Sequence, residues 1–327
     1  MKAAIIVEPG KAPIYGHFND PLPAPDEVLI TVSAAALSNV VKSRASGKHY
    51  SSSGNLPFVV GIDGVGRLPD GRRVYFVLPK PPFGSMSEQT VVALSHCIPL
   101  PDGLDDMTAA AIANPGMSAW GALVERAHLV AGETVLINGA TGTAGRIAIQ
   151  LAKYLGAAKV IATGRNVEEL EEVKQLGADV VIPFTLGTSH PSGAKDYEEA
   201  LKQVFASGIN LVVDYLWGES AKTIIVALAK TVEDKPVRFV HVGGASREED
   251  IELPGAALRS SAIMLMGSGV GSVSRLALVQ SIRSVFEAVQ PAGLKIATTV
   301  VPLSKVEDVW EKATGKPRVV FTVGNHS

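Results

Sequence analysis

One segment constrains the fold of this chain more than any other, because it places a glycine-rich turn between a strand and a helix. Residues 133–153 read E-T-V-L-I-N-G-A-T-G-T-A-G-R-I-A-I-Q-L-A-K. The turn contains three glycines at a spacing of three, Gly139, Gly142 and Gly145. Apolar residues then recur at spacings of four, three and four from Ala144 to Leu155, which is one face of a helix. We therefore predict a buried strand, a tight turn and a helix that packs on the sheet.

The alternation of strand-like and helix-like segments continues after this turn. We predict strands at Thr134–Asn138, Lys159–Thr163, Val180–Ile182, Leu211–Asp214, Arg238–Val242 and Ile263–Met266. Helix-length segments fill the gaps, and the one after Asn166 carries Glu169 in the capping-box position. Such alternation is typical of βαβ units and a parallel sheet.

The flanking regions have a different texture. Up to residue 118 the chain is rich in Pro and Gly, with short β-branched runs at Val28–Val32, Arg73–Leu78 and Gln89–Leu94. A helix over Arg275–Val289 and strands near Ala297–Val301 and Arg318–Val323 are predicted at the other end. We predict an α/β fold in which a doubly wound, Rossmann-type parallel sheet, residues 119–268, is inserted in a mostly β domain formed by residues 1–118 and 269–327.

Composition narrows the class of partner and compartment. The 327 residues are 46% hydrophobic and carry a net charge of −2, so no positive field favours nucleic acid. The single cysteine, Cys97, permits no intrachain disulfide. Glu8 and Pro9 interrupt the first apolar run, and no stretch of about 18 apolar residues is present for a membrane span. A cytoplasmic protein without nucleic-acid or membrane partners is expected.

The glycine turn has the chemistry of a pyrophosphate cradle. Small residues let the backbone approach the anion, and the first amides of the helix point at it with the positive end of the helix dipole. A plain strand-to-helix turn is the alternative, but the βαβ units that follow favour a dinucleotide. The residues assigned to this cradle are Gly139, Thr141, Gly142, Thr143, Ala144 and Gly145.

The end of the second predicted strand indicates which dinucleotide binds. It reads K-V-I-A-T-G-R-N, so Gly164, Arg165 and Asn166 stand where an acidic residue would accept the ribose hydroxyls of NAD. The absence of a carboxylate removes repulsion toward a 2′-phosphate, and a guanidinium can pair with that phosphate. NADPH is the predicted cofactor. The alternative is an arginine that is merely solvated at a strand end.

Several segments along almost the full chain carry a family resemblance. They are L-S-N-V-V-K-S-R-A-S-G-K-H-Y, L-P-F-V-V-G-I-D-G-V-G-R, I-P-L-P-D-G-L-D-D-M-T-A-A-A-I, the glycine turn and the terminal G-K-P-R-V-V-F. With them the chain resembles the zinc-independent quinone oxidoreductase branch of the medium-chain dehydrogenase/reductase superfamily. The resemblance implies that the mostly β domain is GroES-like and binds substrate.

The resemblance also identifies the positions where zinc-dependent relatives bind their catalytic metal. Here they are Ser38, Ile62 and Asn114. A catalytic zinc needs about three protein ligands drawn from Cys, His, Asp and Glu, and these residues do not supply them. We therefore expect no metal.

The resemblance further implies a cofactor in the cleft between the domains. It assigns Ser118 near the cofactor and Gly243, Gly244, Gly267 and Ser268 beside the nicotinamide ring. Each of these glycines also fits a plain turn after a strand. Asn39 matches the family's active-site asparagine and is the predicted catalytic residue that orients the acceptor oxygen, and Tyr50 is a second candidate, as a proton donor. Lys42 and Phe184 depart from the acidic residue and the tyrosine that relatives often carry.

Three functions remain open at this point. The first is NADPH-dependent hydride transfer to a quinone or a similar electron-poor carbonyl compound. The second is reduction of an activated double bond in enones, 2-alkenals or enoyl thioesters, for which Arg44, Lys48 and Arg259 are available to bind an anionic group. The third is a non-catalytic NADPH-binding protein of the crystallin kind. The resemblance also implies a homodimer that pairs through residues 261–267, an apolar edge segment.

Overall fold

The computed structural model describes residues 1–47, 55–232 and 235–324, and the chain divides into two compact units. Unit 1 comprises Met1–Asn114 and Lys295–Ser327, and unit 2 comprises Pro115–Leu294. Each unit is described by itself below. Among the described residues, no helix has both the length and the apolar character that a membrane span requires.

Unit 2 is built on a six-stranded parallel sheet in the order β11-β10-β9-β12-β13-β14. Its strands are β9 (Thr134–Asn138), β10 (Lys159–Gly164), β11 (Val180–Pro183), β12 (Leu211–Asp214), β13 (Val237–His241) and β14 (Ile263–Gly267). Numbered within the sheet this is the order 3-2-1-4-5-6 of the doubly wound dinucleotide-binding fold. The predicted fold class and all six predicted strands are confirmed, with bounds that differ by no more than one residue.

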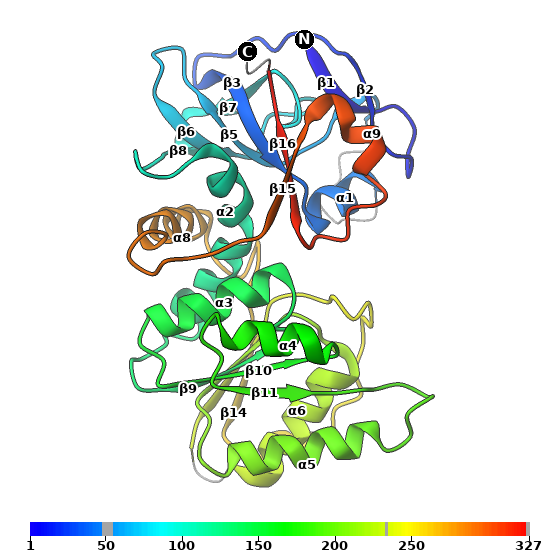
Figure 1. Ribbon diagram of the computed structural model, residues 1–327, viewed down its shortest axis with the longest axis vertical. Helices are drawn as coiled ribbons and strands as arrows, with labels where there is room; N and C mark the ends of the chain where they lie inside the picture. Colours follow the sequence, from blue (N-terminus) through cyan, green and yellow to red (C-terminus); the bar gives the residue numbers. More distant parts are fainter. Residues whose placement is uncertain (48–54, 233–234, 325–327) are drawn as a thin grey trace. The chain divides into compact units, whose positions relative to one another are not determined.

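Helices cover both faces of this sheet. α3 (Thr143–Tyr154) and α4 (Val167–Lys174) pack over β9, β10 and β11, whereas α5 (Gly193–Phe205) and α6 (Gly218–Thr231) lie on the opposite face (Figure 1). α4 begins as predicted, because the side chain of Asn166 accepts a hydrogen bond from the amide of Glu169 at 2.8 Å. α7 (Gly255–Arg259) and α8 (Arg275–Ala288) complete the unit, together with the end of α2 (Asp106–Trp120) and the π-helical turn Gly121–Arg126.

Unit 1 is mostly β and contains two sheets. The small sheet pairs β1 (Lys2–Ile6) with β2 (Ile14–His17) and β4 (Phe58–Val59). The large sheet runs β15-β16-β3-β5-β6-β8, with β7 also paired to β3. The strands of the large sheet are β15 (Thr298–Pro302), β16 (Arg318–Thr322), β3 (Glu27–Ala36), β5 (Asp63–Arg67), β6 (Arg73–Val77), β8 (Cys97–Pro99) and β7 (Gln89–Ala93).

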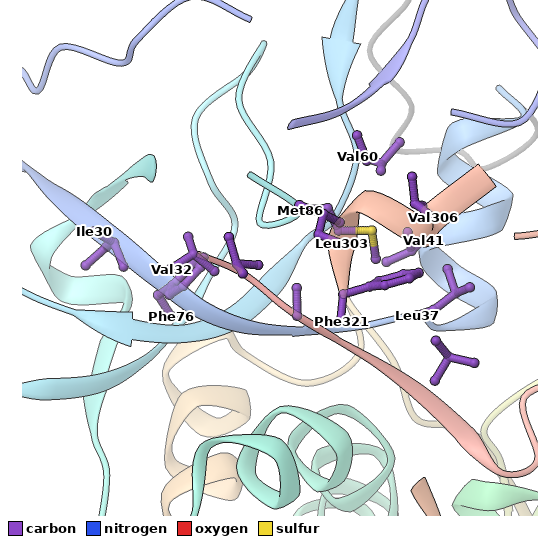
Figure 2. Close-up of a cluster of buried hydrophobic side chains, with 14 of the residues drawn as sticks. Ile30, Val32, Leu37, Val41, Val60, Phe76, Met86, Leu303, Val306 and Phe321 are labelled. Atoms are coloured by element: carbon purple, nitrogen blue, oxygen red, sulfur yellow. The ribbon is translucent and has the colours of Figure 1, made fainter. Parts of the chain in front are cut away.

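The short helices of unit 1 close its core. They are α1 (Asn39–Ala45), α9 (Val306–Val309) and the 3-10 turns Leu94–His96 and Leu303–Lys305. Apolar side chains from distant parts of the chain meet in this core, among them Val32 of β3, Val41 of α1, Phe76 of β6 and Phe321 of β16 (Figure 2). Because β16 pairs with β3 and Phe321 is fully buried, the last strand is an integral part of unit 1.

A buried polar cluster joins three strands of unit 1. Asp63 of β5, Tyr75 of β6 and Arg318 of β16 are 4%, 1% and 6% exposed. The Tyr75 hydroxyl donates a hydrogen bond to the Asp63 carboxylate. Burial raises the pKa of Asp63, while this hydrogen bond and the Arg318 charge act to lower it. Asp63 Oδ1 and two guanidinium nitrogens of Arg318, Nε and Nη2, make no hydrogen bond with any residue that the structure describes, so Arg318 acts on this carboxylate through its charge and not through a direct ion pair.

We predict that Arg318→Met destabilises unit 1 by about 1–3 kcal/mol, because it removes the nearby charge that favours the ionised form of the buried Asp63 carboxyl. The double variant Asp63→Asn, Arg318→Met removes both charges and should regain most of that loss. Urea titrations followed by circular dichroism measure both free energies. Equal destabilisation in the single and double variants would show that the two charges do not compensate each other.

Candidate cofactor site

The glycine turn lies at the carboxyl end of β9 and connects that strand to α3. Gly139 has a φ of +82°, in the left-handed region that glycine adopts without a steric cost. The amides of Gly139 and Ala140 donate hydrogen bonds to the carbonyl oxygen of Thr163 on β10, at 3.1 and 3.0 Å. These bonds fix the backbone of the turn against the neighbouring strand.

The other two glycines of the turn differ in what surrounds them. A Cβ at Gly145 would lie 2.4 Å from the Gly139 carbonyl oxygen and 2.7 Å from Cα of Ala140, so no side chain fits there. At Gly142 the nearest neighbour of such a Cβ is that same oxygen, at 3.4 Å. Gly145 therefore allows α3 to pack closely on the strand, and a side chain at Gly142 would occupy the open side of the turn. This geometry fits a pyrophosphate.

The start of α3 has the electrostatics of an anion site. Gly142 is its N-cap and provides no side-chain cap, and its first turn contains no acidic residue. The positive end of the helix dipole is therefore not neutralised by a carboxylate of its own first turn. Thr143, Ala144 and Gly145 form this first turn, as the sequence predicts.

The end of β10 carries the residues that the sequence assigned to the 2′-phosphate. Gly164 is the last residue of the strand, and a Cβ there would lie 3.1 Å from the Thr141 side chain. Arg165 is exposed and makes no hydrogen bond or ion pair within the described part of the chain. Asn166 uses its side-chain oxygen to cap α4. Phe184 is buried and stacks on Tyr197 with ring centroids 4.7 Å apart, so it is a core residue here.

The remaining predicted cofactor residues of unit 2 lie near the carboxyl ends of β13 and β14. Gly243 and Gly244 follow β13, and a Cβ on Gly244 would meet no atom within 4 Å. Gly267 ends β14, and the amide of Ser268 donates to the His241 carbonyl oxygen at 2.8 Å. Parallel strands end at one edge, so these residues share the carboxyl edge of the sheet with the glycine turn.

Ser118 lies on α2, and its hydroxyl donates to the carbonyl oxygen of Pro115 at 2.9 Å within the same helix. The π-helical turn that follows α2 approaches the carboxyl edge of the sheet. A Cβ at Gly121 would lie 3.6 Å from the Ser268 hydroxyl, and the Arg126 side chain donates to the Gly267 carbonyl oxygen at 2.7 Å. The Ser118 side chain also lies within hydrogen-bonding reach of Tyr215, the residue that follows β12. The structure therefore brings both Ser118 and the segment after it to this edge.

Sequence reasoning missed a row of polar side chains on that edge. Thr163, Asn138, Asp214 and His241 are cross-strand neighbours on β10, β9, β12 and β13. The Thr163 hydroxyl donates to Asn138 at 2.8 Å, and Asn138 donates to Asp214 at 2.8 Å. Asp214 contacts Nδ1 of His241 at 2.9 Å. Each residue is the last or next-to-last of a predicted strand, but a sequence does not show which strand ends are neighbours.

The predicted residues of unit 1 lie around the start of α1. Ser38 is the N-cap, and its hydroxyl accepts a hydrogen bond from the Val41 amide at 3.1 Å. Asn39 is the first residue of the helix and is exposed. Lys42 donates to the Ala313 carbonyl oxygen at 2.8 Å, and burial lowers its pKa. Tyr50 falls outside the described residues.

The three positions that bind metal in zinc-dependent relatives have other roles in unit 1. Ser38 caps α1, Ile62 packs against the apolar core, and Asn114 lies half-buried on α2. Among the described residues, no three His, Cys, Asp or Glu side chains are placed to hold a metal ion. The side chains at these positions do not form a zinc-ligand set.

Comparisons with known proteins agree with this architecture. The zinc-binding dehydrogenase family matches residues 144–289. A probable NADPH-dependent quinone reductase of Emericella nidulans is 31% identical and covers 94% of this chain and 96% of its own. An NADPH-dependent alkenal/one oxidoreductase of Arabidopsis thaliana is 36% identical over 49% of this chain and 45% of its own.

Solved structures share the fold over almost the whole length. A mycobacterial protein complexed with NADPH has a TM-score of 0.82 at 21% identity and covers 98% of this chain and 100% of its own. The quinone oxidoreductase of Thermus thermophilus has a TM-score of 0.78 at 23% identity and covers 99% of this chain and 100% of its own. Together with the full-length likeness to the Emericella enzyme, these findings show that the chain belongs to the quinone oxidoreductase branch of the medium-chain dehydrogenase/reductase superfamily.

Proposed function

We propose that this protein is an NADPH-dependent reductase that transfers hydride to a quinone or a similar electron-poor carbonyl compound without a metal. The observation that carries the proposal is the likeness to an NADPH-dependent quinone reductase over 94% of the chain. The geometry of the glycine turn supports it independently, because Gly145 has no room for a side chain and Gly142 leaves the phosphate side open.

Different residues of the chain bind different parts of NADPH in this proposal. When bound, NADPH supplies the hydride and the electrons. The first turn of α3, Thr143–Gly145, binds the pyrophosphate with backbone amides, and the Arg165 guanidinium pairs with the 2′-phosphate. Gly243, Gly244, Gly267 and Ser268 line the nicotinamide end, and Ser118 lies near the cofactor.

Asn39 is proposed to act on the acceptor from unit 1. Its side chain is exposed at the first turn of α1, where no hydrogen bond within the described residues occupies it. A quinone that accepts hydride becomes a delocalised anion, so a side-chain amide that orients its oxygen is sufficient and water can deliver the proton. Ser38, Ile62 and Asn114 supply no zinc-ligand set, which agrees with chemistry that needs no Lewis acid.

Reduction of an activated carbon–carbon double bond is the second candidate. Two relatives favour it, the Arabidopsis alkenal/one oxidoreductase and a 2-methylene-furan-3-one reductase of Solanum lycopersicum, each 36% identical over 49% of this chain. The chain spans 45% of the length of each of these relatives, so the likeness is partial. Both reactions use the same hydride donor, and the acceptor distinguishes them.

We further propose a homodimer and a cytoplasmic location. β14 is an edge strand of the parallel sheet, and Met264 and Leu265 on it are 43% and 41% exposed. An exposed apolar edge strand is a site for pairing with another chain, and a second copy can supply the same strand across a twofold axis. The cytoplasmic location rests on the single cysteine and stays a prediction.

A substrate panel tests the main proposal. Steady NADPH oxidation is expected with 9,10-phenanthrenequinone or 1,2-naphthoquinone, and the rate should be the same with and without EDTA. Absorbance at 340 nm measures each rate with NADPH and with NADH. Turnover of 2-alkenals or enones without quinone turnover would select the second candidate, and NADPH binding without turnover of any acceptor would indicate a non-catalytic protein.

We predict that Arg165→Glu raises the KM for NADPH about 10- to 100-fold, because a charge-assisted hydrogen bond is lost and repulsion is introduced. The KM for NADH should change little, since NADH has no 2′-phosphate. Arg283→Glu, an exposed arginine on α8, is the matched control. An unchanged KM for NADPH in the Arg165 variant would remove this residue from the cofactor site.

Light scattering after gel filtration tests the dimer. The wild-type protein should elute at about twice the chain mass of 34.2 kDa, and Leu265→Lys should shift it toward the monomer by placing a charge on the edge strand. Leu22→Lys, at an 85% exposed position of unit 1, is the control and should leave the mass unchanged. A monomeric wild-type protein at micromolar concentration would refute this proposal.

A further inference from the structure

The Asp214–His241 pair has no role in the function proposed above. Asp214 ends β12 and His241 ends β13, and the two are directly paired in the sheet. The Asp214 side chain is 0% exposed, whereas that of His241 is 35% exposed. A buried carboxylate thus contacts an imidazole that reaches the surface at the carboxyl edge of the sheet.

The hydrogen bonds of Asp214 fix the tautomer of His241. Asp214 Oδ1 accepts from Asn138 Nδ2 at 2.8 Å and from the Leu216 amide at 3.0 Å, and Oδ2 accepts from the Trp217 amide at 3.1 Å. All of these partners are donors, so Asp214 serves as an acceptor, and Nδ1 of His241 is assigned as the donor toward Oδ2. The second ring nitrogen, Nε2, is then directed away from the carboxylate.

The imidazole is also held by its ring face. Its centroid lies 4.4 Å from that of Trp217 at an interplanar angle of 45°. Trp217 has a φ of +63°, a conformation that costs energy for a residue other than glycine and that is often found at functional sites. Among the residues that the structure describes, Nε2 of His241 makes no hydrogen bond. Asp214 and Trp217 therefore hold the His241 ring in place, and Nε2 is available to bind a ligand.

The position of His241 indicates which part of a ligand it meets. The glycine turn and Arg165 belong to the half of the sheet formed by β9, β10 and β11, and His241 belongs to the half formed by β12, β13 and β14. A dinucleotide crosses the carboxyl edge of a doubly wound sheet with one nucleotide on each half. If the glycine turn binds the pyrophosphate and Arg165 binds the adenosine phosphate, His241 lies on the nicotinamide half.

We propose that His241 is a cofactor-binding residue whose Nε2 makes a hydrogen bond to the nicotinamide riboside of NADP(H), and that Asp214 is its positioning residue. A ribose hydroxyl or the carboxamide supplies the partner, because both can donate to and accept from an imidazole nitrogen. The inference rests on the proposed function, since it requires that the dinucleotide bind at this edge.

Calorimetry with two ligands tests this assignment without any turnover. NADP⁺ carries both nucleotides, whereas 2′,5′-ADP carries only the adenosine half with its phosphates. His241→Ala should weaken NADP⁺ binding about three- to tenfold, the effect of one hydrogen bond, and leave 2′,5′-ADP binding unchanged. Arg165→Glu should weaken both ligands, because it acts on the half that they share.

Two further variants separate binding from folding. His190→Ala removes another exposed histidine of unit 2 and should bind both ligands as the wild type does. Asp214→Asn should reproduce the selective loss of NADP⁺ affinity if it acts through His241, and His241→Gln replaces His241→Ala should the alanine variant not fold, as judged by its melting temperature.

The outcomes distinguish this inference from the proposed function. Wild-type protein that binds neither ligand would refute the proposed function itself. Wild-type protein that binds both, with His241 variants that bind NADP⁺ equally well or lose both ligands in equal measure, would overturn the role of His241 and leave the proposed function intact.

Discussion

The close approach of α3 to β9 is the contact on which the proposed cofactor site depends. Gly145 lies so near the Gly139 carbonyl oxygen that a Cβ would sit 2.4 Å from it, and any side chain would force the helix away from the strand. The N-terminus of α3 would then be displaced from the glycine turn, and the two would no longer face a common binding position. Two hydrogen bonds from the amides of the turn to the Thr163 carbonyl oxygen fix the turn relative to β10. Gly164 and Arg165 follow Thr163 directly in the chain.

The carboxyl edge of the parallel sheet brings together polar side chains from strands that are distant in sequence. Asn138, Asp214 and His241 are neighbours because β9, β12 and β13 are adjacent in the sheet. From β9, the strand order runs to β10 and β11 on one side and to β12, β13 and β14 on the other. The strand order thus places β10, β11 and the glycine turn after β9 on one side of this point and the Asp214–His241 pair on the other. A dinucleotide that spans both halves would contact backbone amides at the glycine turn on one half and the His241 side chain on the other.

Sequence reasoning predicted the parallel sheet well, because apolar runs such as Leu211–Asp214 and the glycine turn carry strong local signals. It predicted the cap at Asn166 correctly, and the side-chain oxygen that forms this cap is therefore already engaged within α4. Sequence reasoning did not find the Asp214–His241 contact, because that contact depends on the pairing of β12 with β13, which the sequence does not show. The buried group formed by Asp63, Tyr75 and Arg318 was likewise hidden, since its members lie on three strands far apart in the chain.

The way β16 completes unit 1 has a consequence for the order of events during synthesis. Val320 pairs with Ala36, so two residues from opposite ends of the chain must meet before the large sheet is whole. All strands of the parallel sheet, by contrast, leave the ribosome before β15 does. The inserted unit can fold on the nascent chain, while β3 keeps its apolar side chains uncovered until β16 has been translated.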